Sequence, residues 1–597
     1  MSELFDLKWL WLSTFLFSTL TFAIPKVAGC RCLPFQSCWP TLQDWSALNS
    51  SIQGNLVAVR PVAAVCYPAE FNEERCKYVN ASWTDPVWRA AEPGAVQWEN
   101  WEAWPARNER CYIETTNTTC GQGSVSLYSA KVVSASQIQE AVRFARTHDI
   151  RLVIKNSGHD FLGRSSAPES LQIFTHGMKG IQLHNNFMPK GAPRNSGGKG
   201  YAVTIEAGVS VAELYGAVSE QNRTVIAGAA GTIGAAGGYI QGGGHSPFGA
   251  WKGLGSDNAL EFQVVLASGR LVYANAYQNS DLFWALRGGG GGTFGVVVSA
   301  TLRTHPEVPV VVSNINITTS LDPSSHFWDG FAELHRALPA LNDAGGSGYY
   351  AAWPNYPLNA TAGVSTMSVI LFFANYSDTA KVDQLYLPLI SKLKRIEGIM
   401  TQYKAFSSPS VNATLSSIIS PQNDTGVFAL IASRLYSKDL LTSQNGPEKF
   451  AKAWSSLTHP PGIPILGNVV AGGAVAANGD TIDSAVNPAW RKTTVHTAFQ
   501  RTWSPTATLA EQQAVLNNVT NVELPIIRSP EGADKMGAYV NEGYAYETDF
   551  QASFWGKNYD RLYKIKQQVD PTGLFITRRG VGSEDWDDSG LCRIAAK

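Results

Sequence analysis

A histidine in a glycine-bounded loop is the residue whose setting points most directly to chemistry. His159 follows the predicted short strand 150–155 and stands in the loop 156–163, and further glycine-rich stretches follow at 228–246 and 288–295. Backbone N–H groups approach a phosphate closely only where side chains are absent, so such loops can cradle an anion. Outside such a setting, a loop histidine is more often solvated or simply hydrogen-bonded.

Neither common nucleotide fingerprint accounts for these glycines. The chain lacks Gly-x-x-x-x-Gly-Lys-Ser/Thr, and no Gly-x-Gly-x-x-Gly stands in a Rossmann setting with an acid about 20 residues further on. From composition alone, flexible surface loops explain the glycines as well as a cofactor site does.

The two ends of the chain indicate a secretory protein with disulfides. Residues 10–23 are apolar and uncharged, but they are fewer than the roughly 20 that a spanning helix needs, so residues 1–23 are interpreted as a signal peptide, with an uncleaved anchor as the alternative. Seven early cysteines and the late Cys592 predict disulfides, one of which ties the C-terminus back to the early cluster. A metal site at Cys30, Cys32 and Cys38 is the alternative, although no histidine stands at finger spacing nearby.

Sequons for N-glycosylation support a path through the secretory compartments. The sequence contains Asn-x-Ser/Thr at Asn49, Asn80, Asn117, Asn222, Asn316, Asn359, Asn375, Asn412, Asn423 and Asn518.

Helical and strand patterns alternate regularly from residue 125. Ser136-Gln137-Ile138-Gln139 fits a capping box and begins a helical pattern that ends at His148. A strand at 201–207 and a capped helix from Ser210 follow, and 261–274 alternates as a hairpin. The elements that must position the loops therefore belong to a mixed α/β or α+β unit.

A second domain is expected beyond residue 307. Between 308 and 534 glycine thins out, and a strand at 368–373 mixes with helices at 378–395 and 509–522. The final segment, 535–597, carries an amphipathic helix from Tyr559 that stops at Asp570-Pro571.

The glycine-rich motifs occur in the order of a known flavoprotein family. Ile-Lys-Asn-Ser-Gly-His-Asp-Phe-Leu-Gly-Arg-Ser at 154–165 resembles the pyrophosphate loop of the FAD-binding domain in the vanillyl-alcohol oxidase superfamily. Segments that match later family motifs lie at 232–234, 242–246, 255–258 and 287–297, and 554–562 resembles the C-terminal segment of berberine bridge enzyme. The whole is most similar to the secreted fungal branch called isoamyl-alcohol-oxidase-like.

This resemblance implies an α+β fold in several parts. It implies a signal peptide at 1–23, a Cys/Trp-rich N-terminal segment at 24–124, a two-lobed PCMH-type FAD-binding domain at 125–307, an α/β substrate domain at 308–534, and a berberine-bridge-type segment at 535–597 that completes the FAD domain.

The resemblance also implies how FAD is held. His159 matches the histidine joined covalently to the flavin 8-methyl carbon, while the cysteine that makes a second link in some relatives is replaced by Ala230. A single covalent bond is therefore expected. The other residues implied to contact FAD are Asn156, Ser157, Gly158, Asp160, Gly163, Arg164, Ser165, Thr232, Gly234, Gly243, Gly244, Asp257, Gly295, Val296 and Asn558.

A catalytic base is harder to choose. Relatives carry Tyr-x-Asn-Tyr on a strand facing the flavin, and here the segment is Tyr539-Val540-Asn541-Glu542. Glu542 could accept a proton if partial burial raises its pKa, whereas a structural carboxylate paired with an arginine or a backbone amide explains it equally well. Tyr539 and His245 are the other candidates.

Charge and composition limit the partners. The 597 residues include 47 Lys and Arg against 48 Asp and Glu, and 44% are apolar, which argues against a nucleic-acid binder or a disordered chain. We expect a secreted, or otherwise endomembrane-lumenal, FAD-dependent oxidoreductase that takes hydride from an alcohol or related C–H centre of a small molecule, with O2 as oxidant, H2O2 as product and no metal. The alternatives are a carbohydrate oxidase, an oxidative cyclase or desaturase, and a non-catalytic glycoprotein.

Overall fold

The computed structural model describes residues 27–113, 119–322, 326–359, 362–419, 425–532 and 535–594. The expected signal peptide at 1–23 lies outside these residues, as do Asn117 and Asn423. Within the described ranges, no helix is both long and apolar enough to cross a bilayer.

Two sheets carry the glycine-rich part of the chain. The first has the order β1 (Leu56–Ala58), β2 (Tyr128–Lys131), β4 (Ser170–Phe174), β3 (Arg151–Lys155), and only β1 runs antiparallel to its neighbour. The second is antiparallel, with the order β5 (Ile181–His184), β6 (Ala202–Glu206), β10 (Val296–Arg303), β8 (Ala259–Val265), β9 (Leu271–Asn275). A short pair joins β7 (Arg223–Thr224) to β11 (His305–Pro306). The predicted hairpin at 261–274 is confirmed as β8 and β9.

Two helices pack beside these sheets, and one begins earlier than predicted. Helix α5 (Val211–Ser219) has the predicted capping box, in which the Ser210 side chain accepts from Glu213 N. Helix α4 (Ala135–Thr147) is capped by Ser134 rather than Ser136. The Ser-x-x-Gln pattern occurs twice, two residues apart. The first copy is used because the buried Gln137 can then bond Val133 N and Ile52 O.

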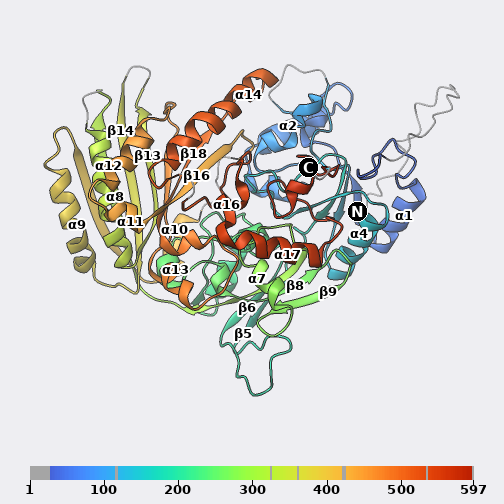
Figure 1. Ribbon diagram of the computed structural model, residues 1–597, viewed down its shortest axis with the longest axis horizontal. Helices are drawn as coiled ribbons and strands as arrows, with labels where there is room; N and C mark the ends of the chain where they lie inside the picture. The colour runs from blue at the N-terminus through green and yellow to red at the C-terminus, as the bar shows by residue number, and fades with distance from the viewer. Residues whose placement is uncertain are drawn as a thin grey trace.

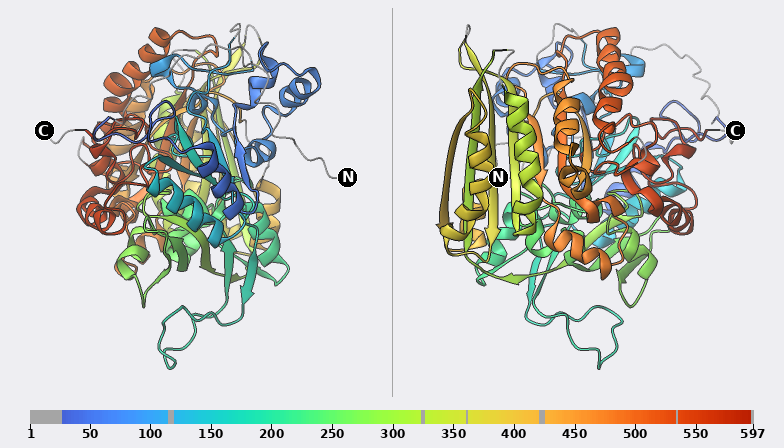
Figure 2. Two further views of the ribbon diagram at one scale, coloured as in Figure 1. Left: turned by 90° about the vertical axis from the view of Figure 1, so that its right-hand side faces the viewer. Right: turned by 60° about the vertical axis from the view of Figure 1, so that its left-hand side comes forward.

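A seven-stranded antiparallel sheet forms the second part of the molecule (Figure 1). Its order is β15 (Met400–Ser408), β12 (Val310–Ser320), β14 (Gly363–Ala374), β13 (Gly346–Pro357), β17 (Ile465–Val469), β18 (Thr493–Arg501), β16 (Leu430–Ser437). Helices α8 (Phe327–Asp343), α9 (Thr379–Leu393) and α12 (Gly446–Ser455) cover one face (Figure 2). The other face packs against the glycine-rich part, because alternate strand residues such as Val310 and Val312 join its core. The expected α+β class is confirmed.

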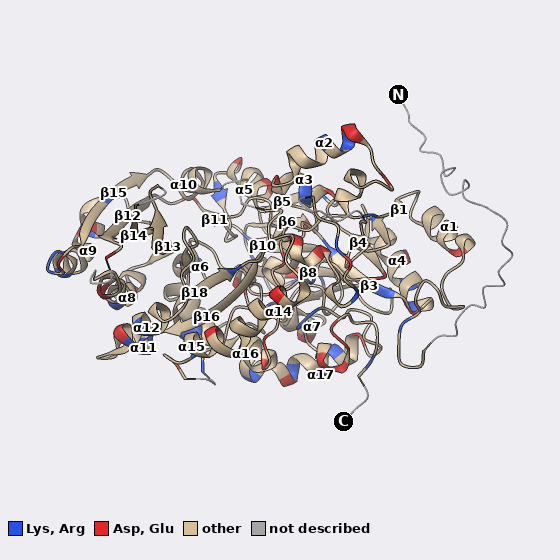
Figure 3. Ribbon diagram, turned by 90° about the horizontal axis from the view of Figure 1, so that it is seen from above, with Lys and Arg blue, Asp and Glu red and all other residues tan. Residues whose placement is uncertain are grey.

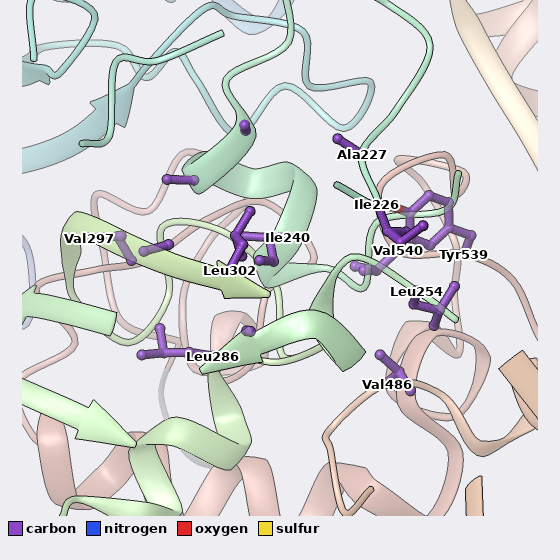
Figure 4. Close-up of a cluster of buried hydrophobic side chains, with 14 of the residues drawn as sticks. Ile226, Ala227, Ile240, Leu254, Leu286, Val297, Leu302, Val486, Tyr539 and Val540 are labelled. Carbon is purple, nitrogen blue, oxygen red and sulfur yellow. The ribbon is translucent and has the colours of Figure 1, made fainter. Parts of the chain in front are cut away.

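The C-terminal segment returns to the glycine-rich part, as expected. Tyr539 and Val540 pack beside Ile226, Leu254 and Val486 in the core (Figure 4). Helices α16 (Phe550–Trp555) and α17 (Tyr559–Val569) follow, and α17 ends at Asp570 as predicted. Figure 3 shows acidic and basic residues together along the outer side of α17.

A buried lysine fastens α17 to the glycine run 288–295. Lys566 Nζ donates to Thr293 O at 2.8 Å, to Asp570 Oδ2 at 2.6 Å and to Phe575 O at 2.7 Å. A buried ammonium is tolerated where carbonyl and carboxylate oxygens satisfy all three of its protons. The lysine therefore fixes α17 against the loop that the glycines form.

The N-terminal segment is structured, which its sequence did not predict. It contains α1 (Leu42–Ser51), α2 (Glu73–Ser82) and α3 (Pro86–Ala91) besides β1. The remaining α-helices are α6 (Gly249–Lys252), α7 (Ser280–Ala285), α10 (Val411–Ile418), α11 (Lys438–Thr442), α13 (Gly473–Ala477), α14 (Leu509–Asn518) and α15 (Leu524–Arg528).

All eight cysteines form disulfides. Cys30 pairs with Cys592, which confirms the predicted tie between the chain ends, and the other pairs are Cys32–Cys38, Cys66–Cys76 and Cys111–Cys120. The pairing rules out the metal alternative for the first three cysteines. Four disulfides are typical of proteins from oxidising compartments.

Replacing both Cys30 and Cys592 by serine should destabilise the protein by about 3–5 kcal/mol, because this bond spans 562 residues and restrains nearly the whole unfolded chain. The matched control is Cys66→Ser with Cys76→Ser, whose bond spans 10 residues and should cost less. Differential scanning calorimetry of both variants checks the order, and equal losses in Tm would contradict it.

Candidate active site

A cavity of about 530 Å³ lies where the glycine-rich loops, the seven-stranded sheet and the C-terminal segment meet. The loops supply residues from 156–165, 228–241 and 291–297. Strands β13, β16, β17 and β18 supply a second group of lining residues, and 539–542 supplies a third. The site is thus assembled from segments that are distant in sequence.

Most of the predicted residues meet at this cavity. Its lining includes Asn156, Ser157, Gly158, His159, Asp160, Arg164, Ser165, Ala230, Gly234, Gly295, His245, Tyr539 and Glu542. Thr232 supports it from behind, since its hydroxyl lies 2.7 Å from His159 Nε2.

Six of the residues expected to contact FAD do not line the cavity, so their contact with FAD stays a prediction, and each has a contact within the protein. Gly163 lies against the Trp101 ring, and the Gly244 amide bonds Tyr539. Asp257 is buried in an ion pair with Arg491. The remaining three are Gly243, which lies beside Val486, Val296, which is buried in the core, and Asn558, whose amide donates to Val486 O. On β10 it is the neighbouring Val297, rather than Val296, that lines the cavity.

His159 is held as a neutral imidazole. Burial lowers its pKa to about 4, so the ring is uncharged near neutral pH. Its Nε2 is engaged by Thr232, and its carbonyl accepts a bond from Trp98 Nε1 at 3.0 Å. Gln97 N donates to Gly158 O at 3.0 Å. The N-terminal segment therefore clamps the histidine loop, a role that nothing in its sequence pattern indicated.

The loop side of the cavity fits FAD. Gly238 and Gly291 face each other so closely that a Cβ on Gly291 would lie 2.6 Å from Gly238 Cα. Two amide oxygens on the lining, Asn156 Oδ1 and Gln241 Oε1, are buried and have no hydrogen-bond partner within the described part of the chain. Bare backbone and unsatisfied acceptors are what a ligand with many polar groups requires.

A half-buried carboxylate links the C-terminal segment to two histidines. Glu542 Oε1 lies 2.7 Å from His245 Nε2, and Oε2 lies 3.4 Å from His496 Nδ1. Asn468 Nδ2 donates to Glu542 Oε2 at 3.1 Å and contacts His496 Nδ1 at 3.0 Å. Burial acts to raise the pKa of Glu542, but His245, followed by His496 and Asn468, lowers it to about 2.

The net shift of the Glu542 pKa is therefore downward, so the condition under which Glu542 would act as the base is not met. The carboxylate is ionised near neutral pH, and it is paired with histidines rather than with an arginine or a backbone amide. Sequence could not supply this answer because the partners come from β17, β18 and the glycine-rich loop.

Tyr539 and Asn541 join the same segment to the glycine loops. Tyr539 Oη accepts from Gly244 N at 3.0 Å and from Asn541 Nδ2 at 2.7 Å, and burial raises its pKa above the ordinary value. Asn541 Oδ1 accepts from Arg164 Nη2 at 3.1 Å, and Arg164 Nε donates to Asp160 Oδ1 at 2.7 Å. A neutral tyrosine is fixed beside His245, with ring centroids 5.5 Å apart.

Several lining residues were not foreseen. These are Trp98 and Phe161, whose rings stack 4.5 Å apart, and the residues of the substrate-side wall, namely Tyr349, Ile418, Ile431, Leu466, Asn468 and Ala498. The strand predicted at 368–373 indicated a sheet in this part of the chain, but it did not indicate which face of the sheet would meet the cavity.

Comparison with known proteins agrees with this geometry. A family model described as FAD binding domain matches residues 127–275, and one described as berberine and berberine like matches residues 538–582. An uncharacterized FAD-linked oxidoreductase of Arthroderma benhamiae is 48% identical, over 96% of this chain and 97% of its own. The FAD-linked oxidoreductase malF of Malbranchea aurantiaca is 41% identical, over 95% of this chain and 94% of its own.

A solved flavoprotein structure has the same fold. The VAO-type flavoprotein MtVAO713 from Myceliophthora thermophila C1 is 28% identical and superposes with a TM-score of 0.86, covering 95% of this chain and 100% of that one. The expected family and the expected cofactor are both confirmed. This chain binds FAD and belongs to the oxidoreductases of the vanillyl-alcohol oxidase and berberine bridge enzyme superfamily.

Proposed function

We propose that the protein is a secreted oxidase that takes hydride from an alcohol or related C–H centre of a small molecule, with FAD joined covalently to His159 alone. When bound, FAD supplies the hydride acceptor, which O2 regenerates with release of hydrogen peroxide. The observation that carries the proposal is the 2.7 Å contact between His245 and Glu542 in the cavity that the glycine loops line.

His245 is better placed than Glu542 to accept the substrate proton. The ionised carboxylate can only accept a hydrogen bond, so His245 Nε2 donates to it and Nδ1 is the ring nitrogen left to accept a proton. That Nδ1 is buried and has no partner among the described residues. Glu542 then stabilises the imidazolium that forms when Nδ1 takes up a proton, the role that a carboxylate plays beside a histidine base.

Tyr539 orients groups rather than removing protons. Its raised pKa keeps it protonated, and its oxygen already accepts two hydrogen bonds. Of the three candidates from the sequence, His245 is thus the proposed base, Glu542 its positioning partner and Tyr539 a fixed neighbour.

His159 is the proposed attachment point for FAD. A neutral imidazole is a nucleophile, and the bond from Nε2 to Thr232 leaves Nδ1 as the nitrogen to be alkylated. Ala230 lines the cavity with a methyl group, which offers no second attachment.

Glu542→Gln should slow flavin reduction by about 10²- to 10⁴-fold, because the amide cannot stabilise the protonated His245. Anaerobic stopped-flow absorbance with an alcohol that reduces the wild-type flavin measures the rate, and a coupled peroxide assay in air distinguishes an oxidase from a dehydrogenase. Asp560→Asn, on the exposed side of α17, is the control. A wild-type reduction rate in Glu542→Gln would refute the role of the carboxylate.

The lowered pKa of Glu542 should also make the stability of the fold depend on pH. In the folded protein this pKa falls from its ordinary value of 4.5 to about 2, so ionisation of Glu542 stabilises the fold above pH 4.5 and loses that effect as the pH falls towards 2. The difference in Tm between wild type and Glu542→Gln should be largest above pH 5 and should shrink by pH 3. A difference independent of pH would show that the carboxyl pKa is not depressed.

His159→Ala should release its flavin when the protein is denatured in acid, while the wild-type pellet stays yellow. The control is His184→Ala, a histidine of the same glycine-rich part that bonds Thr204 outside the cavity. Flavin fluorescence of the band on a denaturing gel gives the result, and a wild-type protein that releases free FAD would end the covalent proposal.

A further inference from the structure

Two rows of side chains lie on one face of the seven-stranded sheet, and all of their members except His496 line the cavity. In the first row Tyr349 on β13 stands opposite Asn468 on β17, which stands opposite His496 on β18. Two residues along, Leu466 stands opposite Ala498. Because side chains two apart share a face of a sheet, a polar row and an apolar row lie side by side.

The two rows differ in depth. The Tyr349 hydroxyl is buried, whereas Leu466 is 39% exposed. The Tyr349 hydroxyl therefore lies at the inner end and Leu466 near the entrance, and Ile418 and Ile431 add apolar surface to the lining. A substrate that reaches the polar row must lie along the apolar one.

Two polar atoms at the inner end have no partner. The Tyr349 hydroxyl and His245 Nδ1 are both buried, neither has a hydrogen-bond partner in the described ranges, and the two rings lie 6.2 Å apart. A buried polar atom without a hydrogen-bond partner destabilises the empty site. One hydroxyl group of a ligand can satisfy both, since its oxygen accepts from Tyr349 and its proton is donated to His245.

The charges in the cavity are already paired. Arg164, the one lysine or arginine among the described lining residues, is bonded to Asp160, and Glu542 is bonded to His245. A carboxylate or ammonium on the ligand would find no free counter-ion, and each further hydroxyl against the apolar row would be buried without a bond. Charged molecules and sugars are both disfavoured.

We propose that the substrate is an uncharged, predominantly apolar alcohol, and that Tyr349 binds its hydroxyl while Leu466, Ile418 and Ile431 hold its apolar body. This inference rests on the proposed function for the reaction, but it concerns binding and can be tested without turnover. Tyr349 keeps its proton in this role, because burial and the nearby Glu542 raise its pKa well above the ordinary value.

A tertiary alcohol tests the inference, since it has no carbinol hydrogen to give up. 2-Phenyl-2-propanol is titrated into the holoenzyme and its dissociation constant is measured from the change in flavin absorbance, beside tert-butylbenzene, 2-phenylpropanoate and cellobiose. In the wild type the alcohol should bind most tightly of the four. Tyr349→Phe should raise the dissociation constant of the alcohol by about 3- to 10-fold, which corresponds to the loss of one hydrogen bond. The dissociation constant of tert-butylbenzene should stay unchanged.

Tyr350→Phe is the matched control. Tyr350 is the next residue on the same strand and points to the opposite face, where its hydroxyl bonds His335 and Thr497. Its loss should lower Tm and leave all four dissociation constants unchanged. Leu466→Arg, at a partly exposed position, should weaken the binding of the alcohol and allow 2-phenylpropanoate to bind.

Two results would overturn the inference: equal binding of the alcohol by wild type and Tyr349→Phe, or tighter binding of cellobiose than of the alcohol. If the binding pattern holds but no primary or secondary alcohol reduces the flavin, the inference stands and the proposed function fails. If alcohols reduce the flavin but Tyr349→Phe binds normally, the inference alone fails.

Discussion

The Glu542 carboxylate is the charge around which the site is arranged. A charge withdrawn from water is costly unless it is paired and hydrogen-bonded, and the partners of this half-buried carboxylate come from three separate parts of the chain: His245, Asn468 and His496. If the sheet were displaced, the carboxylate would lose Asn468 and His496 as partners. If the C-terminal segment were displaced, the histidines would lose the carboxylate. The placement of the sheet against the glycine loops thus depends on site electrostatics as well as on apolar packing.

The cofactor side of the site could be predicted because its signal is local. A glycine-bounded histidine, bare backbone and the strands around them all lie within short windows of sequence, and they predict a close-fitting ligand before any fold is known. Two motif residues, Asp257 and Asn558, lie outside the cavity lining, and their polar side chains have partners in the protein itself, Arg491 in one case and Val486 O in the other.

The substrate side could not be predicted, for a geometrical reason. Tyr349 and Tyr350 are adjacent, yet one lines the cavity and the other bonds His335 in the helix-covered core. A period of two indicates a strand with two faces and does not say which face meets the glycine loops. The depressed pKa of Glu542 could not be predicted either, because every partner that lowers it is remote in sequence. The N-terminal segment, without clear periodicity, gave no sign that Trp98 would brace His159.

The disulfide between Cys30 and Cys592 joins an early part of the chain to a part that is synthesised much later. The histidine loop is among the earlier parts to leave the ribosome, whereas Glu542, α17 and the last cysteine leave it at the end. The wall of the cavity and the disulfide both need the segment from Glu542 to Cys592, so neither can form before that segment has been synthesised. A product truncated before Glu542 carries a histidine loop with no finished site around it.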